Sequence, residues 1–152
     1  MKVQEYIGED GSNPFKAWFD GLNAQAAARV FVEEKEVTMA LTRDYKQTIR
    51  ERAARDPDFA ASLMNEAVTS ILNGEPETAR LILRELVNST IGFEHLAEEL
   101  NKPSKSVHRM LSPKGNPTMD NLTNIFSVLQ RRLHFDIEVK LTTHNKRRLQ
   151  YS

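Results

Sequence analysis

The chain has 152 residues, of which 39 % are hydrophobic and 28 % charged, a composition typical of one globular domain. The absence of cysteine excludes disulfides, thiolate metal sites and a cysteine nucleophile. Basic and acidic residues balance at 21 each, so the overall charge indicates no partner, and no apolar run approaches the roughly 18 residues of a membrane span. We therefore expect a cytoplasmic protein that does not enter a membrane.

The first 32 residues predict a strand and two short helices. Lys2–Ile7 has a strand pattern, and Asn13-Pro14 and Asn23 are helix start signals, because asparagine caps free amides and proline fits the first helical position. The second helix is expected to span Ala24–Val37. The first helix carries an apolar stripe formed by Phe15, Trp18, Phe19 and Leu22. We expect this stripe to dock on the helical domain or on another copy, because each aromatic ring buries about 150–250 Å².

From Thr42 onward the pattern predicts helices almost throughout. Thr42 and the pair Asp56-Pro57 are start signals, Gly74 ends a helix in the left-handed conformation that glycine adopts most easily, and Pro76 opens the next helix. Further helices are expected at about 93–100, 104–111 and 118–133. The helices that start at Thr42, Asp56-Pro57 and Pro76 carry rows of apolar residues. These residues are Tyr45, Ile49, Ala53, Phe59, Ala60, Leu63, Met64, Ala67, Val68, Leu72, Ala79, Ile82, Leu83 and Leu86.

The last element has a different period. Phe135, Ile137, Val139 and Leu141 alternate with polar residues, which predicts a strand over 134–142, followed by a flexible basic tail at 143–152. A lone strand leaves its backbone groups unpaired. Two partners are open: a second copy of the chain, which makes these four residues a dimer contact, or the strand near the N-terminus of the same chain. We favour the homodimer.

Residues 93–121 have the pattern of two short helices around a sharp turn. Asn101 suits a left-handed turn, and Ser104 is expected to cap the second helix. The residues expected to face inward or to form the turn are Leu96, Ala97, Leu100, Asn101, Val107, Met110 and Leu111. This arrangement is a helix-turn-helix, whose second helix enters the major groove of double-stranded DNA.

The distribution of charge favours the same interpretation. Residues 101–118 contain four basic residues and no acidic one, the pattern of a surface that meets phosphate. The candidate DNA-binding residues are Lys102, Ser104, Lys105, Ser106, His108, Arg109, Lys114 and Asn116. Arg109 and Lys105 are the best candidates for groove or phosphate contacts, whereas the residues that flank the helix suit phosphates. The two serines fit base contacts and capping equally well, and His108 is better explained as an exposed polar residue.

This stretch resembles the helix-turn-helix of the Cro/lambda-repressor (XRE) superfamily. The resemblance is carried by Ala97, Asn101, Val107 and Met110 and by the following Asn116-Pro117-Thr118. Asparagine replaces the family's turn glycine, and Gly92-Phe93 stands where a glutamine is usual, so one customary phosphate contact is not carried over.

A longer resemblance covers about residues 39–139. The phrases ALTRDYKQTI, NGEPETARLILRELVN and KPSKSVHRMLSPKGNPTMDNL are similar to prophage-type HigA-like antitoxins. The resemblance implies a dimeric regulator that represses its own operon by binding operator DNA and that has a HigB-like toxin as a second partner.

Residues 1–32 resemble a different family. KVQEYIGEDGSNPFKAWFDGLNAQAAARV is similar to the opening strand and helix of the HigB-like, RelE-related ribonuclease toxins. The later strands, which hold that family's basic catalytic residues, do not follow, because the antitoxin-like sequence starts at Met39. We therefore expect no ribonuclease activity and hypothesise an in-frame fusion of a toxin fragment to an antitoxin.

No other pattern of catalytic or metal-binding residues competes with this interpretation. His95, His108, His134 and His144 lack the spacing of metal ligands, and no nucleophile motif, phosphate-binding glycine loop or paired-carboxylate signature occurs. We predict that the chain is not an enzyme and needs no metal or other cofactor.

Together these patterns predict a mainly α fold: a helical bundle with a lambda-repressor-like helix-turn-helix, a short C-terminal strand and a small βα N-terminal arm. The expected segments are a toxin-like fragment (1–32), a junction (33–41), a helical antitoxin segment (42–75), the helix-turn-helix domain (76–133), the dimerisation strand (134–142) and the tail (143–152). The expected function is a sequence-specific DNA-binding regulator that represses its own operon as a dimer. A toxin-neutralising module with little DNA binding is the alternative, and an RNA-cleaving toxin the third.

Overall fold

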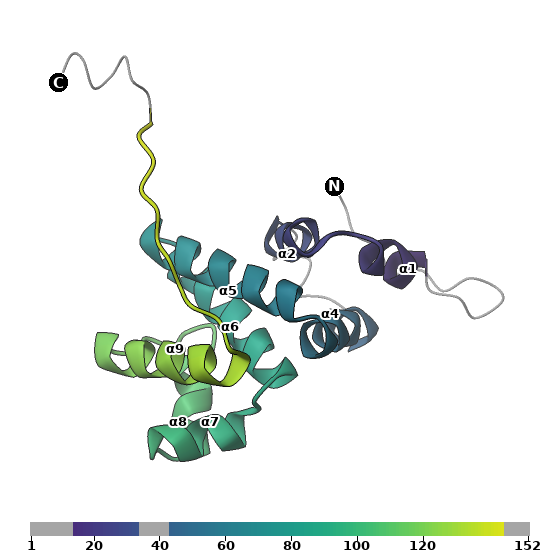
Figure 1. The fold of residues 1–152 in the computed structure, drawn as a ribbon. Helices are drawn as coiled ribbons and strands as arrows, with labels where there is room; N and C mark the ends of the chain where they lie inside the picture. Colours follow the sequence, from purple (N-terminus) through teal and green to yellow (C-terminus); the bar gives the residue numbers. More distant parts are fainter. Residues whose placement is uncertain (1–13, 34–42, 145–152) are drawn as a thin grey trace, which may run out of the picture.

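The computed structural model describes residues 14–33 and 43–144, which are mainly helical as predicted. The elements are α1 (Pro14–Asp20), α2 (Ala24–Glu33), α4 (Arg43–Arg55), α5 (Pro57–Leu72), α6 (Pro76–Ser89), α7 (Phe93–Leu100), α8 (Ser104–Met110) and α9 (Met119–Leu133). Figure 1 shows α5 and α6 at the centre, with α1 and α2 at one end and α7, α8 and α9 at the other. The predicted strand at Lys2–Ile7 and the basic tail beyond residue 144 lie outside the described residues.

Local sequence signals explain where the helices begin and end. The side chain of Asp56 accepts hydrogen bonds from the backbone amides of Asp58 and Phe59, and Pro57 occupies the first turn, so this predicted start is confirmed. The amide oxygen of Asn23 accepts in the same way from the N–H of Ala26. Gly74 follows the end of α5 with a positive φ of 79°, as expected for a glycine at a helix end.

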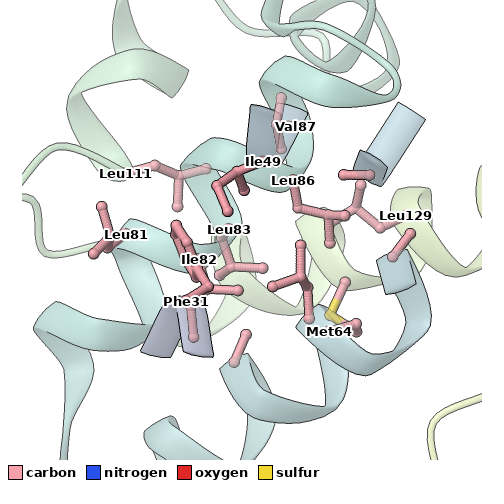
Figure 2. Close-up of a cluster of buried hydrophobic side chains, with 14 of the residues drawn as sticks. Phe31, Ile49, Met64, Leu81, Ile82, Leu83, Leu86, Val87, Leu111 and Leu129 are labelled. Atoms are coloured by element: carbon pink, nitrogen blue, oxygen red, sulfur yellow. The ribbon is translucent and has the colours of Figure 1, made fainter. Parts of the chain in front are cut away.

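The core is one continuous cluster of buried apolar side chains from α1 through α9. Figure 2 shows Phe31 of α2, Met64 of α5 and Leu129 of α9 around the apolar residues of α6. The residues of α6 that are predicted to face inward are buried. Leu81 and Val87, two further residues of α6 that the periodicity did not predict to face inward, are buried as well. Helix α6 therefore packs on more than one face, against α4, α5 and α7.

The aromatic stripe of α1 docks within the same chain. Phe15 and Phe19 are buried, their rings stack with centroids 5.6 Å apart, and the ring of Phe19 meets Phe59 of α5 edge-on at 5.6 Å. Trp18 stays 43 % exposed. Helix α2 adds Phe31 to the same core, so the N-terminal arm, residues 14–33, packs on α4 and α5.

A buried arginine holds the arm in place. The guanidinium of Arg52, on α4, donates to the carbonyl oxygens of Phe19 at 2.6 Å and Leu22 at 2.5 Å, and to the carboxylate of Asp56 at 3.2 Å. It also lies over the rings of Phe19 and Phe59, 5.3 and 5.2 Å from their centroids. Phe19 lies at the end of α1 and Leu22 in the turn after it, so the positive charge of Arg52 lies at the carbonyl end of the helix, where it is favourable.

The predicted strand at 134–142 is not formed in the described part of the chain. His134 ends α9 in the left-handed conformation, and the residues after it continue without helix or strand along α5. Phe135 and Ile137 are half-buried against the core, whereas Val139 and Leu141 are 57 % and 91 % exposed. A strand requires a second backbone for its hydrogen bonds, and no described segment of the chain lies alongside as a strand.

We expect Arg52→Ala to lower the free energy of unfolding by about 2–4 kcal/mol, because two carbonyls and a carboxylate lose their buried donor. Urea denaturation followed by circular dichroism measures this loss. The matched control is Arg55→Ala, which removes an exposed arginine that binds Asp20 at 2.6 Å and should cost at most about 1 kcal/mol. Equal losses in the two variants would contradict the role of Arg52.

Candidate nucleic-acid interface

Helices α7 and α8 are joined by a sharp turn at Asn101. This residue has φ 54° and ψ 47°, so the left-handed turn predicted there is confirmed. The backbone N–H of Asn101 donates to the carbonyl of Glu98, and the N–H of Lys102 donates to that of Ala97. These bonds close α7 and let the chain reverse into α8 within three residues.

The inner faces of α7 and α8 pack against each other and the core. Among the residues predicted to face inward, Leu96, Ala97, Val107 and Leu111 are buried, while Leu100 and Met110 are half-buried. A further contact comes from two rings: the imidazole of His108 stacks on buried Phe93, with centroids 3.9 Å apart and planes 18° apart. One face of His108 is therefore used to fix α8 against the start of α7, which sequence periodicity did not indicate.

The outer face of α8 is polar and cationic. Lys105, His108 and Arg109 are exposed, and Ser106 is half-buried. Lys105 and Arg109 are four residues apart, which places them on one side of the helix. The predicted capping role of Ser104 is wrong: Pro103 is the N-cap residue, no side chain caps the helix, and Ser104 is already the first helical residue. Its hydroxyl is one position too far along the helix for a capping bond.

The cations of this region are not neutralised within the described chain. Lys102, Lys105, Arg109 and Lys114 are exposed, and none forms a salt bridge with any residue of 14–33 or 43–144. By contrast, the cations within 3.4 Å of a carboxylate in the first helices are Lys16, Arg29, Arg50, Arg52 and Arg55. These four cations around α8 thus have no ion-pair partner among the described residues.

The loop after α8 carries the remaining candidate residues. Lys114 and Asn116 are exposed on either side of buried Gly115, whose N–H donates to the carbonyl of Ser112 at 2.9 Å. A Cβ at Gly115 would lie 2.2 Å from the carbonyl oxygen of Met110, so the loop folds back tightly on the end of α8. Two arginines of α6, Arg80 and Arg84, donate hydrogen bonds to carbonyls of this loop. No sequence motif predicts these hydrogen bonds.

Helix α9 is tied to α7 by charge. Glu99 accepts from Arg131 at 2.5 Å and from Arg132 at 2.9 Å. The hydrogen bond from Arg132, supported by the charges of both arginines, holds the pKa of Glu99 below its usual value. The start of α9 is also set locally, because the Thr118 hydroxyl accepts from the N–H of Asn121. Both ends of the loop after α8 are therefore anchored.

A scan against protein-family models, a search of curated proteins and a search of solved structures found no match for this chain. The described residues include no group of three or more metal-ligating side chains. None of the described helices has the length and apolarity required to cross a membrane. The features of this chain that indicate a function are therefore the geometry and the charge around α7 and α8.

We expect Gly115→Ala to lower the free energy of unfolding by about 1–3 kcal/mol, because the added methyl group overlaps the carbonyls of Arg109 and Met110. Thermal unfolding measures the effect. Gly21→Ala is the matched control, since a Cβ there meets its nearest atom, the carbonyl oxygen of Trp18, at 3.4 Å. A Gly115→Ala variant as stable as Gly21→Ala would show that the loop is not tightly packed.

Proposed function

We propose that the chain is a sequence-specific DNA-binding regulator in which α7 and α8 act as a helix-turn-helix that represses the chain's own operon. One observation carries the proposal. Helix α8 buries one face against α7 and the core, while its other face, with the adjoining turn and loop, presents cations that no described carboxylate neutralises. A short helix held in this way fits the major groove, and unpaired cations fit phosphates.

The proposed contacts divide into two kinds. Arg109 and Lys105 lie on the outer face of α8, where arginine can make two parallel hydrogen bonds to guanine worth about 1–3 kcal/mol of base discrimination. Lys102 and Lys114 flank the helix, in the turn and in the loop. Contacts from such flanking positions go to phosphates, which position the protein but do not distinguish sequences. Affinity for all DNA should therefore fall steeply with salt.

The proposed active form is a dimer. Val139 and Leu141 of the extended C-terminal segment are largely exposed, and Leu72 at the end of α5 is 63 % exposed. Pairing of residues 138–142 with those of a second copy would cover these apolar side chains and supply the missing backbone partners. A dimer carries two copies of α8, as recognition of two half-sites about 34 Å apart requires. Phe135 and Ile137 serve the chain's own core and are not part of this contact.

Neutralisation of a toxin through α4 and α5 is the weaker proposal. The N-terminal arm covers the apolar side of both helices with Phe15, Phe19 and Phe31. A partner protein would have to displace the arm, including its bonds to Arg52, before it reached that side.

We expect Arg109→Ala to reduce discrimination between the chain's own promoter and scrambled DNA, and Lys114→Ala to weaken binding to both DNAs alike. In the proposed complex, Arg109 contacts base edges from the outer face of α8, whereas Lys114 contacts only phosphates from the loop. Gel-shift titrations over a range of salt concentrations measure both effects, and Lys114→Ala should lower the salt slope by about one unit.

Arg29→Ala is the control, since this arginine on α2 is paired with Glu33 and Glu66 at the opposite end of the molecule. It should bind DNA as the wild type does. Identical losses on promoter and scrambled DNA for Arg109→Ala, or no retention of DNA by the wild type at low salt, would contradict the proposal.

We expect Leu141→Glu to shift the chain from dimer to monomer in sedimentation equilibrium, because it puts a charge that is costly to bury in place of an apolar side chain that the paired segments would cover. Helical content by circular dichroism should not change, as Leu141 is 91 % exposed in the single chain. Asp136→Ala, a change at an exposed residue outside 138–142, is the control. An undiminished dimer would place the contact elsewhere.

A further inference from the structure

Three successive carbonyls after α8 accept hydrogen bonds from one neighbouring helix. Arg84 donates to the carbonyl of Leu111 at 3.0 Å, and Arg80 donates to those of Ser112 at 3.1 Å and Pro113 at 3.0 Å. Both arginines lie on α6, four residues apart and so on one side of that helix. The carbonyls belong to the residue that ends α8 and to the following turn, and that of Ser112 also accepts from the N–H of Gly115.

The loop is held from its other side by backbone packing. Gly115 lies so close to the last turn of α8 that a Cβ would come within 2.5 Å of the Arg109 carbonyl oxygen. Residues 111–115 are thus held by hydrogen bonds from α6 and by close packing against α8. Lys114, inside this segment, remains exposed and forms no salt bridge with the described residues. The position of the Lys114 charge relative to α8 is therefore set by the contacts of the neighbouring loop residues.

We propose that Arg80 and Arg84 are positioning residues for DNA binding. They hold the loop 111–115 in the conformation that places Lys114 beside the exposed face of α8. Lys114 can then contact a phosphate while the side chains of α8 contact bases. This inference rests on the proposed function. The guanidinium of Arg80 is required as a planar fork, since it binds two carbonyls at once, which an ammonium group on a flexible stem does not reproduce.

Arg80→Lys tests the fork separately from the charge, because it keeps the positive charge at the same position. We expect Arg80→Lys and Arg80→Ala to weaken promoter binding by about tenfold, a difference of roughly 1.4 kcal/mol. Both should also speed hydrogen exchange of the backbone amides at 112–116, which is measured without DNA. Arg29→Ala, the control used for DNA binding, should leave both quantities unchanged.

A double-mutant cycle tests the coupling to Lys114 in the full chain. Lys114→Ala should weaken wild-type binding, but in an Arg80→Ala background it should change Kd by no more than about twofold, because the lysine is no longer positioned. Independent, additive losses would overturn the inference. Wild-type affinity for the promoter in Arg80→Lys would also overturn the inference, because Arg80 would then contribute to binding only through its charge.

The outcomes separate this inference from the proposed function. If the wild type retains no DNA, the proposed function fails and the positioning role fails with it. If the wild type binds its promoter while Arg80→Lys binds equally well and exchanges no faster, only the positioning role fails. Should Arg80→Ala unfold, Arg80→Lys still provides both the exchange and the binding measurement.

Discussion

The burial of α6 is the constraint on which the rest of the structure depends. Its apolar side chains pack against α4, α5 and α7, and burying each large one stabilises the fold by about 1.5–3 kcal/mol. That packing fixes the rotation of the helix about its axis, and with it the direction of every polar residue on its flanks. Glu85 consequently meets Arg50 of α4, and Arg80 and Arg84 meet the loop after α8. One helix thus orients both α4 and the proposed DNA-binding elements.

Two buried charges determine how the other elements attach to this framework. Glu85 is buried and accepts two bonds from Arg50, at 2.7 and 3.3 Å, and its hydrogen bond raises the pKa of that arginine. Arg52 is buried and donates to the carbonyls of Phe19, at the end of α1, and Leu22, in the turn after it. A buried charge that loses its partner costs more than the pair itself contributes. Such groups therefore select one docking geometry for α1 and α4, where apolar packing alone would allow several.

Periodicity and capping signals predicted most helices, because both are local properties of the chain. The starts at Asn23, Asp56 and Thr118 and the turn at Asn101 each depend on residues within three positions. The strand at 134–142 was predicted from alternation alone, yet a strand requires a second backbone, which alternation does not provide. The contacts of Arg52, Arg80 and Arg84 span 27–33 residues, so no local pattern could have revealed them.

A chain whose formal charge is zero can still present a cationic surface, and the distribution of ion pairs explains how. Around α1, α2 and α4, carboxylates pair with the cations, and the opposite charges largely cancel at distances longer than the pair itself. Around α8, Lys102, Lys105, Arg109 and Lys114 form no ion pair with the described residues, while Glu99 of the neighbouring α7 is paired with Arg131 and Arg132. What attracts a polyanion is the local, unpaired charge. The region of α8, with its adjoining turn and loop, therefore keeps positive charge of the kind that ion pairs cancel around α1, α2 and α4, and it is the surface that we propose for DNA.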